Sequence, residues 1–320
     1  MKSFQELYTD YQNITENTAT ANVTRGKKYI NDTQRKVLAY LEWPFLEMTG
    51  TRTSVASQNN YELPARMRKL TSVVVTVGST KYRPKPVEDP TFWEYLQSLS
   101  TSSSDATQYF YPQGTEVLLY PTPATAGSTI TMRGRKRWKD LSFDDYTTGT
   151  ITTLTNADQT VVGSATSWLT RAPIGGQWIR VAAGTSAGDY EWYEIESITD
   201  ATNLELVKPY EGTTRTSASL TYTIGEFSVI PSEYHDLLLW RACAIYFMQN
   251  EQDMTRADRF WQMYDGGYEA GRSKNIGGLM GLMIDEAGGK TEGMYLEPLG
   301  AEKEDLKRFR IDSISGESWA

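Results

Sequence analysis

Few residues of this chain could perform chemistry. Its 320 residues include one histidine, His235, and one cysteine, Cys243. A Ser-His-Asp triad, a Cys-His pair and a histidine-based zinc site would all need that single imidazole. One cysteine also excludes an internal disulfide and a Cys-x-x-Cys metal site within one chain. Most common hydrolytic chemistry is therefore excluded, and we expect no metal and no other cofactor.

A group of carboxylates crowds one predicted strand region. Its members are Asp189, Glu191, Glu194 and Glu196. Paired carboxylates perform glycoside hydrolysis, so this chemistry has to be considered. Strand alternation, however, places Glu194 and Glu196 on one face and Tyr193 and Ile195 on the other, which is also the pattern of an ordinary half-buried strand. We therefore expect a structural strand here.

Two other patterns resemble parts of active sites. His235 follows Tyr234 at a predicted helix start. A lone histidine in a first helical turn is more often at the surface or capping the helix than catalytic. No Gly-x-Ser-x-Gly nucleophile elbow lies near it. The glycine-rich residues 277–281 lack the Gly-Lys-Ser/Thr ending of a phosphate-binding loop and follow a helix where a strand is required. We expect neither pattern to be catalytic.

Charge indicates what the chain does not bind as a whole. The net charge of -8 argues against a protein whose overall field gathers nucleic acid. The one clear basic cluster consists of Arg133, Arg135, Lys136 and Arg137. It is either a solvated strand end at the rim of a sheet or a local basic contact patch.

The elements that would position these residues begin with a helical hairpin. Apolar residues at steps of three and four predict a helix with Ser3 as N-cap and Glu6 as capping-box partner. A second apolar face predicts a helix that Pro44 stops just after Trp43. The apolar positions are Phe4, Leu7, Tyr8, Tyr11 and Ile14 in the first helix, and Ile30, Val37, Leu38 and Leu41 in the second.

Strand character dominates the next hundred residues. After a Ser-, Thr- and Asn-rich stretch at 49–60, the β-branched run 70–77 predicts a strand. Strands are also predicted at 116–120 and 128–133, and the Pro- and Gly-containing link between them suits a hairpin loop. Residues 90–99 predict a short helix that carries Phe92, Trp93 and Leu96 inward.

Residues 146–225 form a predicted all-β module. Thr, Ser, Gly and Ala fill its turns, and strands are predicted at 177–182, 190–198, 203–207 and 219–224. About five or six strands in all, with Trp168, Trp178 and Trp192 as core anchors, describe a small β-sandwich or β-barrel. We expect the module to be an insertion in one body, since insertions survive best at exposed loop tips.

The remaining chain predicts two helices and a tail. One helix runs from Pro231 to about residue 250, and another begins at Thr255 with Asp258 three residues on. Periodicity is lost after Gly271. No signal peptide is recognisable, and the longest apolar stretch, 237–248, is too short to span a bilayer, so we expect a product that is cytosolic when made.

These elements predict an α+β protein. Its parts would be a helical bundle body packed with a small antiparallel sheet, an inserted all-β module and an extended C-terminal arm. The expected divisions are 1–145 for the first part of the body, 146–225 for the module, 226–287 for the second part of the body, and 288–320 for the arm.

The order of these pieces resembles the head-to-tail adaptor family of tailed phages, also called connector or neck proteins. A helical hairpin precedes a sheet that is opened by Leu63-Pro64. The later segments that carry the resemblance are residues 68–70, Gly114, 117–123, 129–131 and Leu141, and then 231–234, Leu237, Leu238, Ala242, Tyr264 and Tyr268. The order carries the resemblance, since no single motif in it is strongly specific.

The resemblance implies a non-enzymatic homo-oligomer in the neck of the virion, made in the host cytoplasm. Such a protein forms a ring, often of twelve copies, beneath the portal protein, and receives a tail or nozzle protein on its other face. It would contact the genomic DNA only transiently and without sequence specificity, and no membrane.

The C-terminal arm would dock on the portal. Its sparse aromatics among charges suit a segment that is ordered only on binding. The candidate anchors are Tyr295, Phe309 and Trp319, and the candidate charge-pairing groups are Arg308 and Arg310.

A second function class stays open at this point. The β-module could belong to a tail or receptor-binding component that uses it to bind a partner or a glycan. Such binders more often build trimeric shafts, and no sustained heptad pattern is present here. The helices on both sides of the module therefore favour the connector, and an enzyme comes third.

Overall fold

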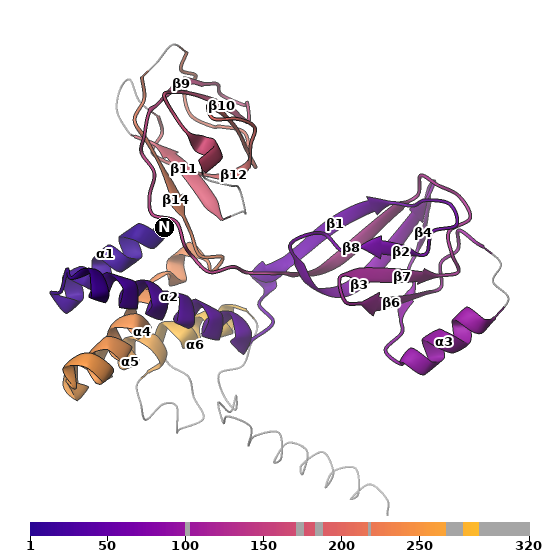
Figure 1. The fold of residues 1–320 in the computed structure, drawn as a ribbon, viewed down its shortest axis with the longest axis horizontal. Coiled ribbons are helices and arrows are strands. Elements are labelled where there is room, and N and C mark those ends of the chain that lie inside the picture. The colour runs from indigo at the N-terminus through magenta and orange to yellow at the C-terminus, as the bar shows by residue number, and fades with distance from the viewer. Residues whose placement is uncertain (100–102, 171–175, 183–187, 217–218, 267–277, 288–320) are drawn as a thin grey trace, which may run out of the picture. The chain divides into compact units, whose positions relative to one another are not determined.

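A computed structural model describes residues 1–99, 103–170, 176–182, 188–216, 219–266 and 278–287. By its internal contacts the chain divides into a first unit, Met1–Leu41 with Asp140–Ala320, and a second unit, Glu42–Lys139. These borders differ from the predicted divisions at 145, 225 and 287, which stay a prediction. The fold is α+β with a β-module (Figure 1).

The first unit opens with the predicted hairpin. Helix α1 (Phe4–Thr15) has the predicted capping box, in which the Ser3 hydroxyl accepts the Glu6 N–H at 3.1 Å and the Glu6 carboxylate accepts the Ser3 N–H at 2.8 Å. Helix α2 (Thr20–Tyr40) ends three residues before the predicted stop at Trp43. Both helices bury the predicted faces, although Ile14 and Leu41 at their ends are only half-buried.

Helix α4 (Asp236–Tyr246) lies among the other helices and is buried on almost every side. It contacts α1, α2 and α5 (Met254–Asp265), while α6 (Gly278–Glu286) contacts α5. The predicted continuous helix over 231–250 was wrong in detail, because a 3-10 turn, η3 (Ser232–Tyr234), precedes α4 and a π-helical turn, η4 (Phe247–Glu251), follows it.

Two further corrections concern the end of the first unit. Helix α5 begins at Met254, and its N-cap is Asp253, whose carboxylate accepts the Arg256 N–H at 3.0 Å; Thr255 is therefore inside the helix. The loss of periodicity expected after Gly271 was wrong for α6, which buries Met280, Met283 and Ile284. Its glycines and short length concealed this pattern.

The β-module of the first unit is one six-stranded antiparallel sheet. Its strand order is β14-β11-β12-β13-β10-β9. The strands are β9 (Thr150–Leu154), β10 (Thr160–Ser164), β11 (Gln177–Val181), β12 (Trp192–Ile198), β13 (Asn203–Leu206) and β14 (Tyr222–Glu226). Isolated bridges from Tyr146, Ile151 and Leu154 reach the segment that runs into β14, so the sheet curls back towards itself. Of the predicted sandwich and barrel, the curled sheet favours the barrel.

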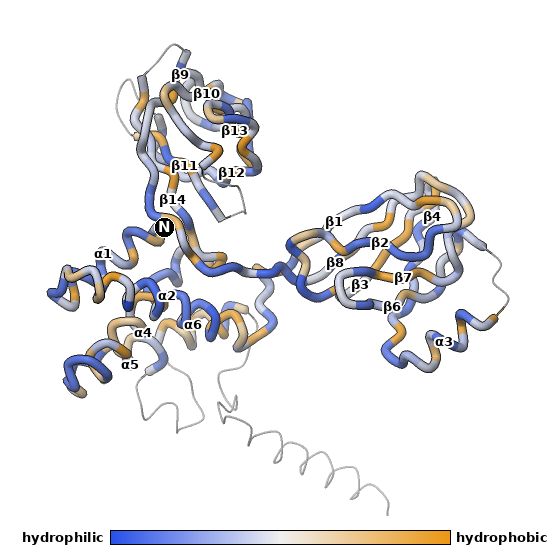
Figure 2. The backbone as a smooth tube through the Cα atoms, viewed as in Figure 1, coloured by the Kyte–Doolittle hydropathy of each residue, from blue (hydrophilic) through white to orange (hydrophobic). Residues whose placement is uncertain are grey.

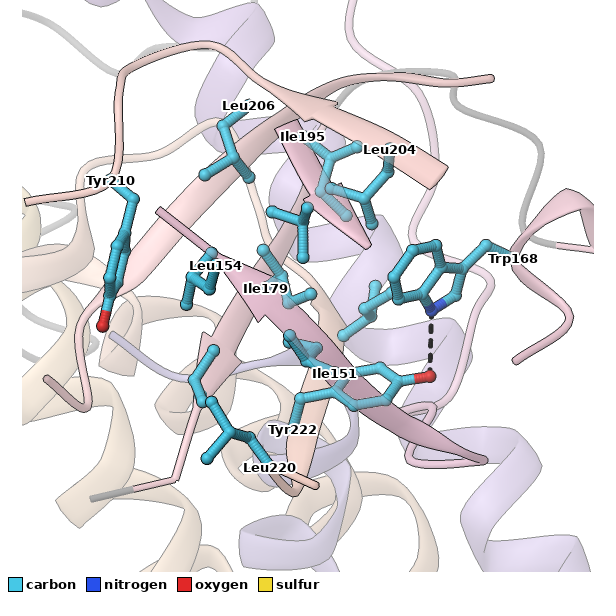
Figure 3. Packing of buried hydrophobic residues seen from close by; sticks show 13 residues of the cluster. Ile151, Leu154, Trp168, Ile179, Ile195, Leu204, Leu206, Tyr210, Leu220 and Tyr222 are labelled. Carbon is cyan, nitrogen blue, oxygen red and sulfur yellow. Dashed lines mark hydrogen bonds between the residues drawn. The ribbon is translucent and has the colours of Figure 1, made fainter. Parts of the chain in front are cut away.

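The curled sheet encloses a core of its own (Figure 3). Trp168, in the 3-10 turn η2 (Trp168–Thr170), is fully buried there, as predicted. Its indole N–H donates a hydrogen bond to the Tyr222 hydroxyl at 2.9 Å. The prediction that Trp178 and Trp192 anchor this core was wrong. Both lie outside it, and each ring makes a T-shaped contact with the Phe227 ring.

The second unit is a sandwich of two four-stranded sheets. One has the order β1-β8-β3-β4, with β1 (Glu47–Thr53), β8 (Thr129–Lys136), β3 (Met67–Val77) and β4 (Thr80–Tyr82). The other has the order β2-β7-β6-β5, with β2 (Asn60–Glu62), β7 (Glu116–Tyr120), β6 (Tyr109–Gln113) and β5 (Lys85–Pro86). Their inner faces share one apolar core that includes Val75, Phe110 and Ile130.

The sandwich corrects two predictions from sequence. The link between β7 and β8 is not a hairpin loop, because it passes from one sheet to the other. Strand β1 falls in the polar stretch at 49–60 that predicted no strand, because it is an edge strand with little apolar surface to bury.

Helix α3 (Pro90–Ser98) covers the outer face of the β2-β7-β6-β5 sheet. Trp93 and Leu96 are buried against Tyr111, Leu118 and neighbouring side chains, and the Trp93 and Tyr111 rings stack at 5.4 Å. The inward prediction holds only in part for Phe92, whose ring meets the Tyr109 ring edge-on at 5.8 Å but whose side chain is 40% exposed. Sheet β1-β8-β3-β4 has no described helix over its outer face.

Candidate functional site

His235 is a structural residue at the start of α4. Its side chain is 2% exposed, its Nε2 atom lies 2.9 Å from the Ile230 carbonyl oxygen, and its Nδ1 atom accepts the Lys2 N–H at 3.2 Å. The predicted surface position was therefore wrong. His235 does occupy the N-cap position of α4, although its side chain makes no capping hydrogen bond to that helix. Burial lowers the pKa of His235 below its usual value. The neutral ring connects the N-terminal residues to the loop before α4.

Cys243 is also part of the core. It is a free cysteine in the middle of α4, and burial raises the pKa of its thiol to about 12. A thiol that stays protonated is a poor nucleophile and a poor metal ligand. Among the described residues no group of His, Cys, Asp and Glu is arranged to hold a metal ion, and no helix has the length and apolarity to cross a bilayer.

The side chains of strand β12 alternate between the two faces of the sheet, as predicted for the acidic residues of this region. Ile195 is buried in the module core and Tyr193 packs against it, while Glu196 is exposed on the other face. Asp189 accepts hydrogen bonds from the Tyr193 hydroxyl at 2.5 Å and from the Glu191 N–H at 3.1 Å. These contacts give Asp189 a role in holding the loop before β12.

The basic cluster lies along the last residues of β8 and just beyond its end, on a central strand of the sheet. Arg133 is exposed on the outer face of its sheet, between Thr49 of β1 and Ser72 of β3. Arg135 is half-buried, donates to the Trp43 carbonyl at 2.9 Å and pairs with Glu47 at 3.2 Å. Its contacts hold the start of β1 against β8.

The outer face around Arg133 is polar and basic. A hollow on this face is lined by Arg133, Lys81, Arg83 and side chains of β3 and β8. Lys136 and Arg137 are exposed at the end of β8. That this surface binds a partner stays a prediction, and the structure adds Lys81 and Arg83, which lie far from the cluster in sequence.

The two units differ in charge. The second unit contains 12 Lys and Arg against 8 Asp and Glu, a net charge of +4. The full chain contains 32 and 40, so the first unit contains 20 and 32, a net charge of -12. The sequence carries this difference, but it becomes visible only when the borders at 41 and 139 are known.

A groove in the first unit, here named the α1–α5 groove, combines apolar and basic side chains. Its lining residues are Ile14 and Glu16 at the end of α1, Phe247 of η4, and Arg256, Arg259, Phe260, Gln262 and Met263 of α5. The Phe247 and Phe260 rings stack at 5.7 Å. The sequence did not reveal this groove, because helical periodicity shows that a face is apolar but not what lies beside it.

The outer face of α3 is a second apolar surface. Phe92, Tyr95 and Leu99 are 40%, 57% and 39% exposed. Figure 2 shows hydrophobic and hydrophilic residues alternating along this short helix. The helix therefore presents aromatic surface to solvent as well as to its own sheet.

The predicted portal-binding residues cannot be placed. Tyr295, Arg308, Phe309, Arg310 and Trp319 lie outside the described residues, which end at 287.

One comparison with known proteins finds a match. A family model described as SU10 adaptor protein matches residues 2–173. The matched range covers α1, α2, the whole second unit and the β-module as far as η2. No curated protein matches the chain.

Proposed function

The chain belongs to the SU10 adaptor protein family, a family of structural adaptors of phage virions, and we propose on this premise that it forms the ring that joins the portal to the tail. The family match over more than half of the chain is the observation that carries the proposal. It implies a structural, non-enzymatic role. In the proposed assembly, about twelve copies surround the channel through which DNA leaves the capsid.

Exposed apolar surface supports an assembly of several copies. Met254 and Leu282 are each 62% exposed, and the described residues leave the α1–α5 groove and the outer face of α3 uncovered. Apolar patches of this kind mark protein interaction surfaces. We propose that neighbouring subunits or virion partners cover them.

The helices of the first unit would form the body of the ring subunit, and residues 288–320 would form the arm that docks on the portal. Helix α4, buried among α1, α2 and α5, supports this assignment of the body. The arm proposal rests on the composition of the segment, in which Tyr295, Phe309 and Trp319 are spaced among charges.

Contact with the genome would be weak and independent of sequence. A channel has to let DNA slide, and dense phosphate contacts would hold it back. The net charge of -8 suits this task. Tight, sequence-dependent binding of duplex DNA at physiological salt would contradict this part of the proposal, and Arg133 would then be the first residue to replace.

The test is reconstitution with the portal protein of the same virus. The two proteins are mixed and imaged by negative-stain electron microscopy, and the mass of the complex is measured. We expect a closed ring of this chain on the portal. Isolated single copies on the portal, without a closed ring, would contradict the proposed function even if the free protein is monomeric.

A tail or receptor-binding component is the second candidate function. The observation that favours it is the β-module, which has its own apolar core and exposes Glu196 on its outer face. Such a component would bind a glycan or a tail protein through the module and would stay attached to purified tails that lack capsids. A ring recovered only with portals excludes this candidate.

A further inference from the structure

We propose that the outer face of α3 of one copy docks into the α1–α5 groove of a second copy, and that this contact repeats around the ring. The inference rests on the proposed ring function and identifies its subunit interface. It pairs two surfaces that lie on different units of the chain, α3 on the second and the groove on the first.

The docking helix has the spacing that grooves recognise. Phe92 and Tyr95 are at positions i and i+3 and share one face, and the C-cap residue Leu99 follows at i+7. The Phe92 ring also meets Tyr109 of its own sheet edge-on, which fixes its orientation. Trp93 and Leu96 hold the adjoining face of α3 to the sheet, so the helix is already folded and loses little entropy on docking. An amphipathic helix with anchors at these intervals is a common ligand of hydrophobic grooves.

The groove has matching apolar surface. Phe260 and Met263 of α5 lie beside Ile14 of α1 and Phe247 of η4. Arg256, Phe260 and Met263 are at positions i, i+4 and i+7 of α5 and form one face of that helix. This face and the face from Phe92 to Leu99 each span seven residue steps, or about 10 Å along the axis.

Charge selects the orientation of the contact. The residues around the α3 face include Glu88, Asp89 and Glu94, all exposed, and no Lys or Arg lies between residues 86 and 99. The groove carries Arg256 and Arg259 against Glu16. Among the described residues Arg256 has one long ion pair, with Asp253 at 3.4 Å, and Arg259 has none. An acidic aromatic helix therefore complements this groove.

A contact between two different surfaces is heterologous. Each copy offers one helix and one groove, so the contact can repeat from copy to copy until the ring closes. One short helix in a groove buries little area, so two copies associate weakly in solution. Closure of the ring on the portal adds further contacts and raises the effective concentration of each partner.

Disulfide trapping tests the contact directly. Tyr95→Cys and Met263→Cys are prepared as separate full-length proteins, mixed on the portal and mildly oxidised. The buried thiol of Cys243, with its raised pKa, will not compete. We expect a mixed disulfide-linked dimer. Tyr95→Cys mixed with Val207→Cys, which changes an exposed residue of the β-module, is the matched control and should give none.

Charge reversal gives an independent measurement. Glu94→Lys and Arg259→Glu should each weaken self-association, measured by analytical ultracentrifugation, by roughly fivefold. The double variant Glu94→Lys/Arg259→Glu should recover the original association, because the charges are exchanged on both sides of the contact. Glu62→Lys, at an exposed position on β2, controls for the change in net charge.

The outcomes separate this inference from the proposed function. A closed ring without the mixed dimer, and without recovery in the double variant, overturns the inference and leaves the ring. A double variant Tyr95→Cys/Met263→Cys that yields only internally linked monomers also overturns it, because the contact would then lie within one chain. A wild-type protein that forms no ring on its portal overturns both.

Discussion

The side-chain amide of Asn31 exchanges two hydrogen bonds with the backbone of Leu141. The Asn31 Nδ2 donates to the Leu141 carbonyl at 2.9 Å, and the Leu141 N–H donates to Asn31 Oδ1 at 2.8 Å. Leu141 is the second residue of the chain after its return from the second unit to the first. One side chain on α2 therefore satisfies both backbone groups at the point of return.

Replacement of Asn31 by alanine should lower the free energy of unfolding by about 1 to 3 kcal/mol, because two partly buried backbone groups lose their partner. Urea unfolding followed by circular dichroism measures the change. Lys28→Ala, at an exposed position on the same helix, should be close to neutral. Equal effects of the two substitutions would show that the Asn31 pair contributes nothing to stability.

The hydrogen bond between Trp168 and Tyr222 should stabilise the β-module. Tyr222→Phe leaves the buried indole N–H of Trp168 without this acceptor (Figure 3). It also leaves the Thr148 carbonyl without its donor. We expect a loss of about 1 to 3 kcal/mol in chemical unfolding. Tyr190→Phe removes a hydroxyl from a ring that is 52% exposed and should change stability much less.

His235 should make the fold sensitive to mild acid. Because burial lowers its pKa in the folded state, the ring is neutral in both states above the usual pKa near 6.5 and has no linkage effect there. As the pH falls below 6.5, the unfolded chain takes up the proton first, so stability decreases. The advantage of wild type over His235→Gln should therefore shrink between pH 7.5 and 5.5.

Since His235 is the only histidine, its titration can be followed by one NMR resonance. The expected midpoint lies below 6.5, and a midpoint at or above that value in the folded protein would refute the prediction. His235→Gln keeps a side chain that can hydrogen-bond and removes the titration, and because it also removes the ring beside Phe227, the pH dependence and not the absolute stability is compared.

The β-module should be removable. Tyr146 and Ile224 are joined by two backbone hydrogen bonds at 2.9 and 2.8 Å, so the two ends of the module lie side by side. A short Gly-Ser linker in place of residues 146–225 should therefore leave the helices folded and the ring intact on the portal. Circular dichroism and negative-stain imaging check both.

An insoluble product that no longer binds portal would show that the module belongs to the core of the protein. The contacts most at risk are those of Phe227, whose ring lies against Trp178 and Trp192. Phe227→Leu in the shortened protein tests whether the exposed ring, and not the missing module, causes a loss of solubility.

A protein truncated after Gly288 should stay folded but should no longer bind the portal protein. The described helices end at Glu286, so the truncation removes none of them. We expect capsids assembled with the truncated protein to lose the adaptor and leak DNA. Normal retention on the portal would contradict the arm proposal, and a triple substitution of Tyr295, Phe309 and Trp319 by alanine should reproduce the defect.

The local sequence pattern was enough to predict a helix or strand wherever that element buries one face. The apolar steps from Phe4 to Tyr11, with Ser3 and Glu6 as a capping box, predicted α1 because a helix start depends on residues within one turn. The order of helices and strands also sufficed for the resemblance that the family match confirms. The single histidine and cysteine limited the chemistry without any structure.

Only the tertiary structure decided which faces meet. Phe92 and Trp93 are neighbours of similar character, yet only Trp93 is buried, because one sheet covers one side of α3. Strand β1 was not predicted because an edge strand needs no apolar alternation. Strands β7 and β8 were predicted as a hairpin but belong to different sheets, because strand pairing depends on residues far apart in the sequence. The α1–α5 groove likewise exists only where α1, η4 and α5 are brought together, since periodicity specifies an apolar face but not its partner.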